Sequence, residues 1–139
     1  DYLICTRFRN YLKCIWIILI MRAIFFPLIL FVSIGCEADR SITVQEAHEN
    51  LGNADILFLD VRTRQEFVNE GRIKNALLIP VNVLERRLTE LDQYKEKKII
   101  VYCRSGRRSQ VATDILINNN FNAFNMDGGF LAWKKYSHP

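Results

Sequence analysis

From residue 39 onward the chain alternates short apolar runs with amphipathic segments, and this alternation limits the folds open to it. Several of the amphipathic segments begin with residues that cap helices, such as Thr43 with Glu46 and Thr63 with Glu66. The pattern predicts an α/β fold in which a central, mostly parallel sheet of about five strands carries helices on both faces. Strands are expected at 41–42, 55–60, 76–79, 98–102 and 123–126, and helices at 43–51, 63–70, 82–91, 107–117 and 130–133.

Residues 1–38 differ in composition from the rest of the chain and are expected to be separate from a domain at 39–139. Met21 and Arg22 precede an apolar run that ends in small residues. A basic start, an apolar core of this length and a small-residue end are typical of a signal peptide. The sequence therefore predicts an N-terminal export signal followed by one domain.

Three ways of processing this N-terminal segment are open. Ser33-Ile34-Gly35-Cys36 resembles a bacterial lipobox, which would place a lipid on Cys36, although Ser33 stands where Leu is usual. Cleavage after Ala38 is the second way. The third is an uncleaved membrane anchor over 14–35, a span long enough to cross a bilayer. All three predict an exported domain, either periplasmic or attached to the membrane and facing outside the cytoplasm.

Charge and ligand-type residues exclude several classes of function. The net charge of +4 is too small to indicate a nucleic-acid partner, because such proteins usually carry a concentrated basic face. Of the four cysteines only Cys103 falls in the domain, so no disulfide is expected within it. His48 and His138 are the only histidines, and neither has the setting of a general base. We expect no metal and no cofactor, since no zinc-type ligand set is evident.

The stretch from residue 98 to 109 carries most of the functional information. An apolar run ends in Cys103, three arginines follow (Arg104, Arg107 and Arg108), and a helix is expected to begin close to Ser109. The free N–H groups of a helix start, and a backbone that curls inward at a glycine, stabilise negative charge. We expect these features to lower the pKa of Cys103 and to make it a nucleophile in an anion cradle. A structural cysteine on a solvated basic face is the alternative.

The spacing between Cys103 and Ser109 distinguishes two chemistries. Cysteine phosphatases carry Cys, five residues and then Arg, whose guanidinium clamps a phosphate with two hydrogen bonds. In this chain Ser109 stands at the position of that arginine, and Arg107 and Arg108 come before it. The loop therefore suits a smaller species, such as an outer sulfur atom, better than a phosphate.

Four groups of motifs occur in a familiar order: Leu59-Asp60-Val61-Arg62 with Glu66-Phe67, Gly71-Arg72-Ile73 through Ala76 and Ile79-Pro80, 101–109, and 128–133. On these motifs the chain resembles a single-domain rhodanese, a sulfurtransferase, over residues 41–136. With its expected export signal it is similar to the periplasmic phage-shock type. The chain departs from the family pattern at 71–76, where Gly-Arg-Ile-Lys-Asn-Ala replaces the usual Gly-His-Ile-Pro-Gly-Ala. That departure lies away from the cysteine loop.

The resemblance implies a three-layer rhodanese-like fold and sulfur transfer through Cys103. This residue would take a sulfane sulfur from a small anionic donor such as thiosulfate, form a persulfide, and pass the sulfur to a thiol or cyanide. Asp60 and Arg62 would support the active edge; we expect Asp60 to cap loop amides and Arg62 to pair with a carboxylate. The substrate cradle would consist of Arg104, Ser105, Gly106, Arg107, Arg108 and Ser109.

Two further expectations follow, and two other function classes stay open. Gly128 and Gly129 are expected to allow a tight turn or a close backbone approach, and Trp133 is expected in the core. One alternative function is a non-catalytic rhodanese-like module that carries sulfur or senses oxidants through Cys103. The other, disfavoured by Ser109, is a cysteine phosphatase or an arsenate-reductase-like enzyme. The sequence leaves open the physiological donor and acceptor and the oligomeric state.

Overall fold

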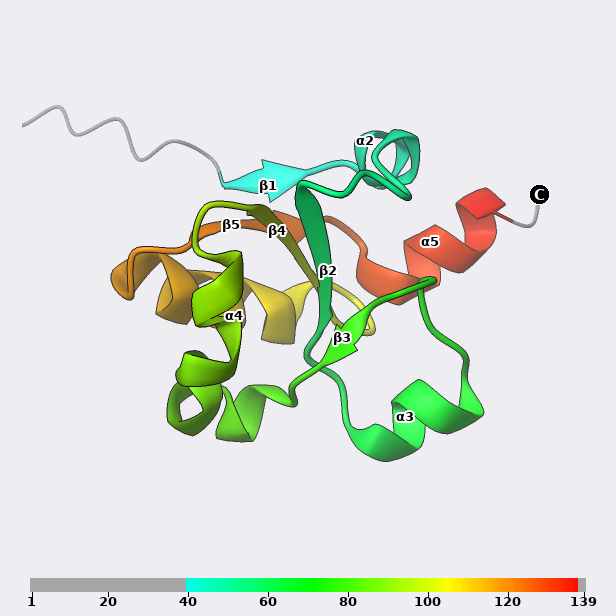
Figure 1. Cartoon of the computed structure of the whole chain (residues 1–139). Coiled ribbons are helices and arrows are strands. Elements are labelled where there is room, and N and C mark those ends of the chain that lie inside the picture. Colours follow the sequence, from blue (N-terminus) through cyan, green and yellow to red (C-terminus); the bar gives the residue numbers. More distant parts are fainter. Residues whose placement is uncertain (1–39, 138–139) are drawn as a thin grey trace, which may run out of the picture. The chain divides into compact units, whose positions relative to one another are not determined.

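The computed structural model describes residues 40–137 and has a central sheet of five parallel strands with helices packed around it (Figure 1). The strand order is β1-β5-β4-β2-β3, and every neighbouring pair is parallel. The sheet therefore confirms the predicted α/β fold. The strands are β1 (Ser41–Ile42), β2 (Ile56–Asp60), β3 (Leu77–Leu78), β4 (Lys98–Tyr102) and β5 (Asn122–Met126). The helices are α2 (Val44–Glu49), α3 (Arg64–Asn69), α4 (Arg107–Asn118) and α5 (Gly129–Ser137), with two 3₁₀ segments, η1 (Val81–Val83) and η2 (Glu85–Tyr94).

Several sequence predictions fall outside the part of the chain that the structure describes. The export segment at 1–38, its lipidation candidate Cys36 and the histidine at position 138 all lie there. Within residues 40–137, no helix is both long and apolar enough to cross a bilayer. The same residues contain no group of three or more His, Cys, Asp and Glu side chains that could hold a metal ion.

The parallel register places two of the predicted functional positions at one edge of the sheet. β2 and β4 pair residue by residue, and the last pair is Asp60 opposite Tyr102. Because parallel strands end at a common edge, Asp60 and the residue that follows β4, Cys103, both lie at the carboxyl edge. β5 flanks β4 on its other side and brings Asn125 to the same region. The predicted meeting of Asp60 and Cys103 at one edge is confirmed.

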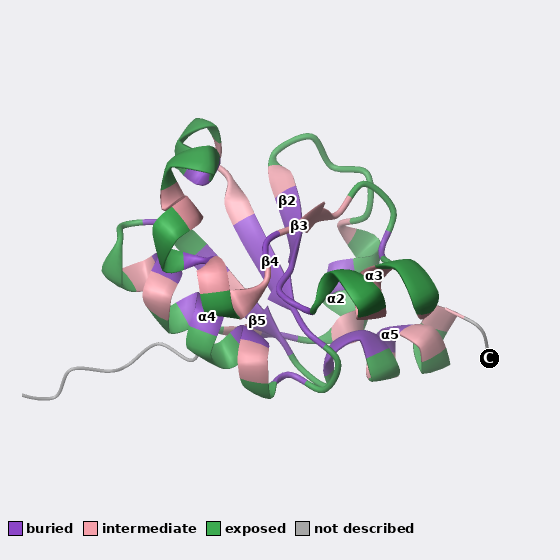
Figure 2. Ribbon diagram, turned by 90° about the horizontal axis from the view of Figure 1, so that it is seen from below, coloured by how far each residue is buried: buried purple, intermediate pink, exposed green. Residues whose placement is uncertain are grey.

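Two apolar clusters cover opposite faces of the sheet and make the fold three-layered (Figure 2). One cluster joins α4 and the two 3₁₀ segments to the sheet through Leu57, Leu59, Leu84, Leu91, Val101 and Leu116, among others. The other joins α2 and α5 to the opposite face through Ala47, Phe58, Ile100, Phe130 and Trp133, among others. Neighbouring strand residues thus enter different clusters, as expected for strands buried on both faces. Trp133 lies in the core, as the sequence predicts.

Two helices begin at the capping boxes that the sequence predicts. The Thr63 hydroxyl accepts a hydrogen bond from the amide of Glu66, and the Glu66 carboxylate accepts one from the amide of Thr63. Thr43 and Glu46 form the same reciprocal pair at the start of α2. Each box satisfies N–H groups that the helix itself leaves free.

The segment predicted as a helix at 82–91 winds more tightly than an α-helix. It forms η1 and η2, in which hydrogen bonds connect residues three apart, as from the amide of Leu84 to the carbonyl of Val81. This winding aligns side chains three positions apart, and the ion pair between Arg87 and Glu90 has that spacing. Leu84 and Leu91 still face the core as predicted. The leucine pattern indicated the buried side of the segment but not its pitch.

A buried ion pair joins the end of β2 to the start of the following loop. Arg62 is fully buried and donates hydrogen bonds of 3.0, 3.1 and 2.7 Å to the two carboxylate oxygens of Asp60. It donates another, of 2.7 Å, to the carbonyl of Gly71. Asp60 also accepts the backbone amide of Arg62 at 2.9 Å. Both expected contacts are therefore present: Asp60 caps a loop amide and Arg62 pairs with a carboxylate.

Replacing Arg62 with Leu is expected to destabilise the domain severely. The change leaves the Asp60 carboxylate buried without its cation, and breaking a buried pair in this way typically costs about 3–5 kcal/mol. Urea denaturation followed by circular dichroism measures the loss. The matched control is Arg87→Leu, which removes the cation of the exposed pair with Glu90 and is expected to change the free energy of unfolding little. Equal unfolding midpoints for the two variants would contradict the assignment.

Candidate active site

Cys103 lies between the end of β4 and the start of α4, at the carboxyl edge of the sheet. Cys103 is 1% exposed, so the thiol is held inside the loop rather than on the surface. The Cys103 Sγ accepts a hydrogen bond from the amide of Gly106 at 3.2 Å and one from the hydroxyl of Ser109 at 3.5 Å. The same hydroxyl also contacts the carbonyl oxygen of Gly106 at 3.0 Å. The loop therefore curls around the sulfur, as the sequence predicts.

Gly106 makes this curl sterically accessible. Its φ of 100° lies in the left-handed region, which glycine adopts without the strain that a Cβ would bring. Gly106 is also the residue that precedes α4, and no side chain caps the helix there. No acidic residue occupies the first turn of α4. The sulfur of Cys103 thus takes the place of the usual anionic or oxygen cap at this helix N-terminus.

The pKa of the Cys103 thiol reflects two opposed influences. Burial raises it, because an anion is costly to remove from water. The hydrogen bonds from the Ser109 hydroxyl and from the amides of Ser109, Ser105 and Gly106 lower it. The hydrogen bonds prevail, and the pKa is lowered overall, in the direction expected from the sequence. The site can therefore hold a negatively charged sulfur at Cys103.

The start of α5 supports the loop from behind. The amides of Phe130 and Leu131 donate to the carbonyls of Cys103 and Arg104 at 2.8 and 3.0 Å. A Cβ at Gly129 would lie 2.6 Å from the Cys103 carbonyl oxygen, closer than real side chains approach. Gly129 is therefore required for the close backbone approach that the sequence predicts. With the two carbonyls bonded to α5, amides of the loop remain directed at the sulfur.

The three arginines of the loop have different surroundings. Arg104 and Arg107 are exposed beside the cradle. Arg108 instead forms two hydrogen bonds, of 2.8 and 2.6 Å, with the carboxylate of Glu66 on α3. The sequence predicts one basic cluster around Cys103, but the structure divides it into two solvent-facing cations and one that is paired.

Sequence reasoning missed two residues of this region. Glu66 appears in the sequence as a helix cap, and nothing local indicates that it also reaches Arg108, which is 42 positions away. Asn125 is 6% exposed, and its side-chain nitrogen would lie 4.0 Å from a Cβ at Gly106. A signal for Asn125 was present, since it is an amide within the otherwise apolar run 123–126. The side chain of Asn125 thus places a buried polar group against the turn at Gly106.

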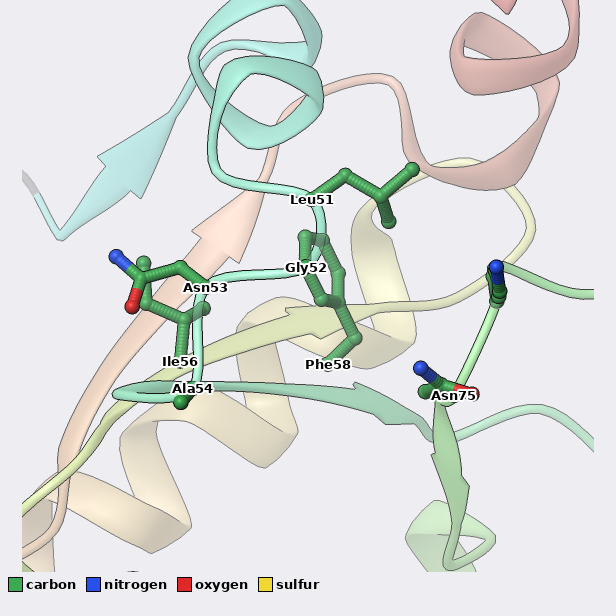
Figure 3. Close-up of a pocket in the computed structure, with 8 residues that line it drawn as sticks. Leu51, Gly52, Asn53, Ala54, Ile56, Phe58 and Asn75 are labelled. Carbon is green, nitrogen blue, oxygen red and sulfur yellow. The ribbon is translucent and has the colours of Figure 1, made fainter.

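Two cavities of the described residues are lined by segments outside the cysteine loop. One, of about 380 Å³, is lined by residues before and at the start of β2, including Asn53, Ile56 and Phe58, and by Asn75 (Figure 3). Since Ile56 begins β2 and Asp60 ends it, this cavity lies toward the amino edge of the sheet. Another, of about 680 Å³, runs along the outer side of β3. Neither of these two cavities is lined by a residue of 103–109.

Comparison with known proteins identifies the fold family. A family model for the rhodanese-like domain matches residues 43–136. The chain belongs to this family. A sulfurtransferase of Allochromatium vinosum is 34% identical over 86 residues, which make up 61% of this chain and 78% of that protein. The structure of a rhodanese-related protein from Thermoplasma volcanium is similar with a TM-score of 0.65 and 31% identity, and covers 72% of this chain and 95% of its own.

A similar domain also occurs within a longer protein and in a further solved structure of about its own length. A tRNA uridine(34) hydroxylase of Hamiltonella defensa is 30% identical over 97 residues, which make up 66% of this chain but 27% of the hydroxylase. A rhodanese-like domain protein of Staphylococcus aureus has a TM-score of 0.62 at 33% identity and covers 68% of this chain and 90% of its own. A similar domain thus occurs in a sulfurtransferase and in a tRNA uridine(34) hydroxylase, and this chain spans about a quarter of the length of the hydroxylase.

Replacing Ser109 with Ala is expected to raise the pKa of Cys103, because the sulfur loses the hydroxyl that donates to it. Below the titration midpoint the fraction of thiolate falls, so alkylation of Cys103 by iodoacetamide slows. The measurement is the rate of alkylation against pH, with Cys103 followed by peptide mass spectrometry. The control is Ser105→Ala, since Ser105 acts through its backbone amide, which the change retains. If the alkylation rate of Ser109→Ala depends on pH as it does in the unsubstituted protein, the hydroxyl of Ser109 does not stabilise the thiolate.

Proposed function

We propose that the protein is a sulfurtransferase that moves a sulfane sulfur from a small anionic donor such as thiosulfate to a thiol or cyanide, through a persulfide on Cys103. The observation that carries the proposal is the set of donors around one buried sulfur, namely the amide of Gly106 and the hydroxyl of Ser109. Membership of a family that includes a sulfurtransferase supports it.

In the first step the Cys103 thiolate attacks the outer sulfur of thiosulfate. A new S–S bond forms on Cys103 while the S–S bond of thiosulfate breaks, and sulfite leaves with the electron pair of that bond. No proton is transferred if Cys103 enters as thiolate, which accords with a site where neither a histidine nor another general base is required. The outer sulfur of the persulfide carries the negative charge, and the loop amides are placed to stabilise it.

In the second step a cyanide ion or a thiolate attacks the outer sulfur of the persulfide. The bond between that sulfur and the Cys103 Sγ breaks, and its electron pair returns to Cys103 as thiolate. Thiocyanate or a new persulfide is the product. The cycle needs no oxidant, metal or cofactor, because sulfur enters and leaves at the same oxidation level.

The dimensions and charges of the cradle favour sulfur over phosphate. The donors lie 3.2 and 3.5 Å from Sγ, so they already surround the sulfur itself. A phosphatase loop places an arginine at the position of Ser109, where it can clamp the oxyanion with two hydrogen bonds. Ser109 is short and neutral, and Arg108 is engaged with Glu66.

Incubation of the purified protein with thiosulfate is expected to add one sulfur atom to Cys103, as measured by intact mass. Cyanide should remove the added sulfur and release thiocyanate, and Cys103→Ser should show neither the adduct nor turnover. The matched control is Cys36→Ser, which removes a cysteine outside the domain.

Other outcomes of this experiment favour other functions. No adduct, together with hydrolysis of an aryl phosphate, would contradict the proposal and support a cysteine phosphatase. No adduct and no turnover would support a binding or oxidant-sensing module. An adduct that neither cyanide nor thiols can remove would support a sulfur carrier in place of a transferase.

We also propose that the protein is exported, on the strength of the apolar N-terminal segment and the lipobox-like Ser33-Ile34-Gly35-Cys36. In a bacterial host the domain is expected to reach the periplasm or the outer face of a membrane. Fractionation followed by mass spectrometry of the mature N-terminus would distinguish a lipid on Cys36 from cleavage after Ala38 or an uncleaved anchor. Recovery of the unprocessed chain in the cytoplasm would contradict the proposal.

A further inference from the structure

A two-pronged ion pair connects α3 to the first turn of α4. Nη1 of Arg108 donates to Oε2 of Glu66 at 2.8 Å, and Nη2 donates to Oε1 at 2.6 Å. The two side chains are 35% and 18% exposed, so the pair is partly shielded from water. Paired, parallel hydrogen bonds of this kind fix the orientation of a guanidinium as well as its position.

The same carboxylate is fixed from its other side by the capping box. Oε2 of Glu66 accepts the amide of Thr63 at 2.9 Å and its hydroxyl at 3.0 Å. The hydrogen bonds from Arg108, and further ones from Thr63, outweigh burial and lower the pKa of Glu66 to about 2. Glu66 is therefore a charged carboxylate held by its own helix start, and it in turn fixes the guanidinium of Arg108.

Arg108 stands in the chain between Gly106 and Ser109, the two residues that donate hydrogen bonds to the sulfur. The pKa of Arg108 is raised mainly by its hydrogen bonds to Glu66, against the effect of burial, and further by the charge of Cys103. The guanidinium is thus within the electrostatic reach of both anions. Among the described residues, Arg108 is the loop arginine that is paired with a carboxylate, whereas Arg104 and Arg107 are exposed.

We propose that Glu66 is a positioning residue that holds Arg108 at the side of the cradle and so keeps an anion such as phosphate from being clamped by its oxygens directly over Cys103. An incoming phosphate has to displace the carboxylate of Glu66 before it can form two hydrogen bonds with Arg108. Thiosulfate needs no such clamp over Cys103, because it presents its outer sulfur to Sγ and the oxygens of the leaving sulfite lie on the far side of that sulfur. This deepens the sulfurtransferase proposal and rests on it, because Glu66 would then add a second barrier to phosphate in a loop where Ser109 already replaces the clamping arginine.

The variant Glu66→Gln tests the charge without removing the helix cap. Glutamine serves at the third helical position of a capping box as glutamate does, so α3 is expected to keep its start. The amide cannot form a charged pair with Arg108, so the guanidinium becomes available to anions. Its charge is also no longer neutralised, which is expected to lower the pKa of Cys103 further.

The probe is inorganic phosphate, and the readout is its protection of Cys103 from iodoacetamide, which requires no turnover. Phosphate is expected to protect Cys103 in Glu66→Gln at a concentration about tenfold lower than in the original protein, the effect of one freed charged hydrogen-bonding group. The alkylation profile of the variant should also shift to lower pH. Glu66→Gln combined with Arg108→Gln should lose both effects. Glu90→Gln is the matched control, because it breaks the comparable pair with Arg87 away from the loop.

The two readouts separate a positioning role from a structural one. Unchanged phosphate protection and an unchanged pH profile in Glu66→Gln would overturn the proposal, whatever happens to stability. Should that variant fail to fold, Arg108→Gln alone is decisive: it is expected to raise the pKa of Cys103, and no change would overturn the proposal. If the unsubstituted protein transfers no sulfur from thiosulfate, the proposed function is refuted instead. Phosphate protection and the pH profile of alkylation would then still report on the role of Glu66.

Discussion

The hydrogen bonds that converge on the Cys103 sulfur connect the fold of this protein to its chemistry. They exist because β4 ends at Tyr102 and α4 begins at Arg107, so the chain between them must turn tightly around Sγ. Burial alone would raise the pKa of the thiol, and the loop amides together with the hydroxyl of Ser109 reverse that effect. A sulfur that is both buried and stabilised as an anion suits reversible attachment of a second sulfur atom.

The rest of the carboxyl edge supports this loop by a continuous set of contacts. The guanidinium of Arg62 lies 4.2 Å from the centre of the Phe130 ring, and the amide of Phe130 donates to the carbonyl of Cys103. Arg62 is in turn fixed by Asp60 at the end of β2. The buried pair therefore acts on the site indirectly, through α5, whereas Glu66 acts on it through Arg108. These two routes explain why polar residues far apart in the sequence meet behind one cysteine.

The sequence predicted those features that depend on local spacing. The capping box at Thr63, the glycine turn into α5 and the strand that ends before Cys103 are each encoded within a few neighbouring residues. The tight 3₁₀ winding after Pro80 was missed, since a leucine pattern indicates which side is buried and not the pitch. The pairing of Glu66 with Arg108 was missed because it depends on how two helices lie in space. The export signal stays a prediction, as residues 1–38 lie outside the described structure.

A crystal structure of the thiosulfate-treated protein tests the central claim most directly. The account predicts one additional atom bonded to the Sγ of Cys103, within hydrogen-bonding distance of the loop amides, with Arg108 still paired to Glu66. The absence of an added atom on the Sγ of Cys103 after thiosulfate treatment would contradict this account. An oxyanion held over the loop by a displaced Arg108 would contradict it as well.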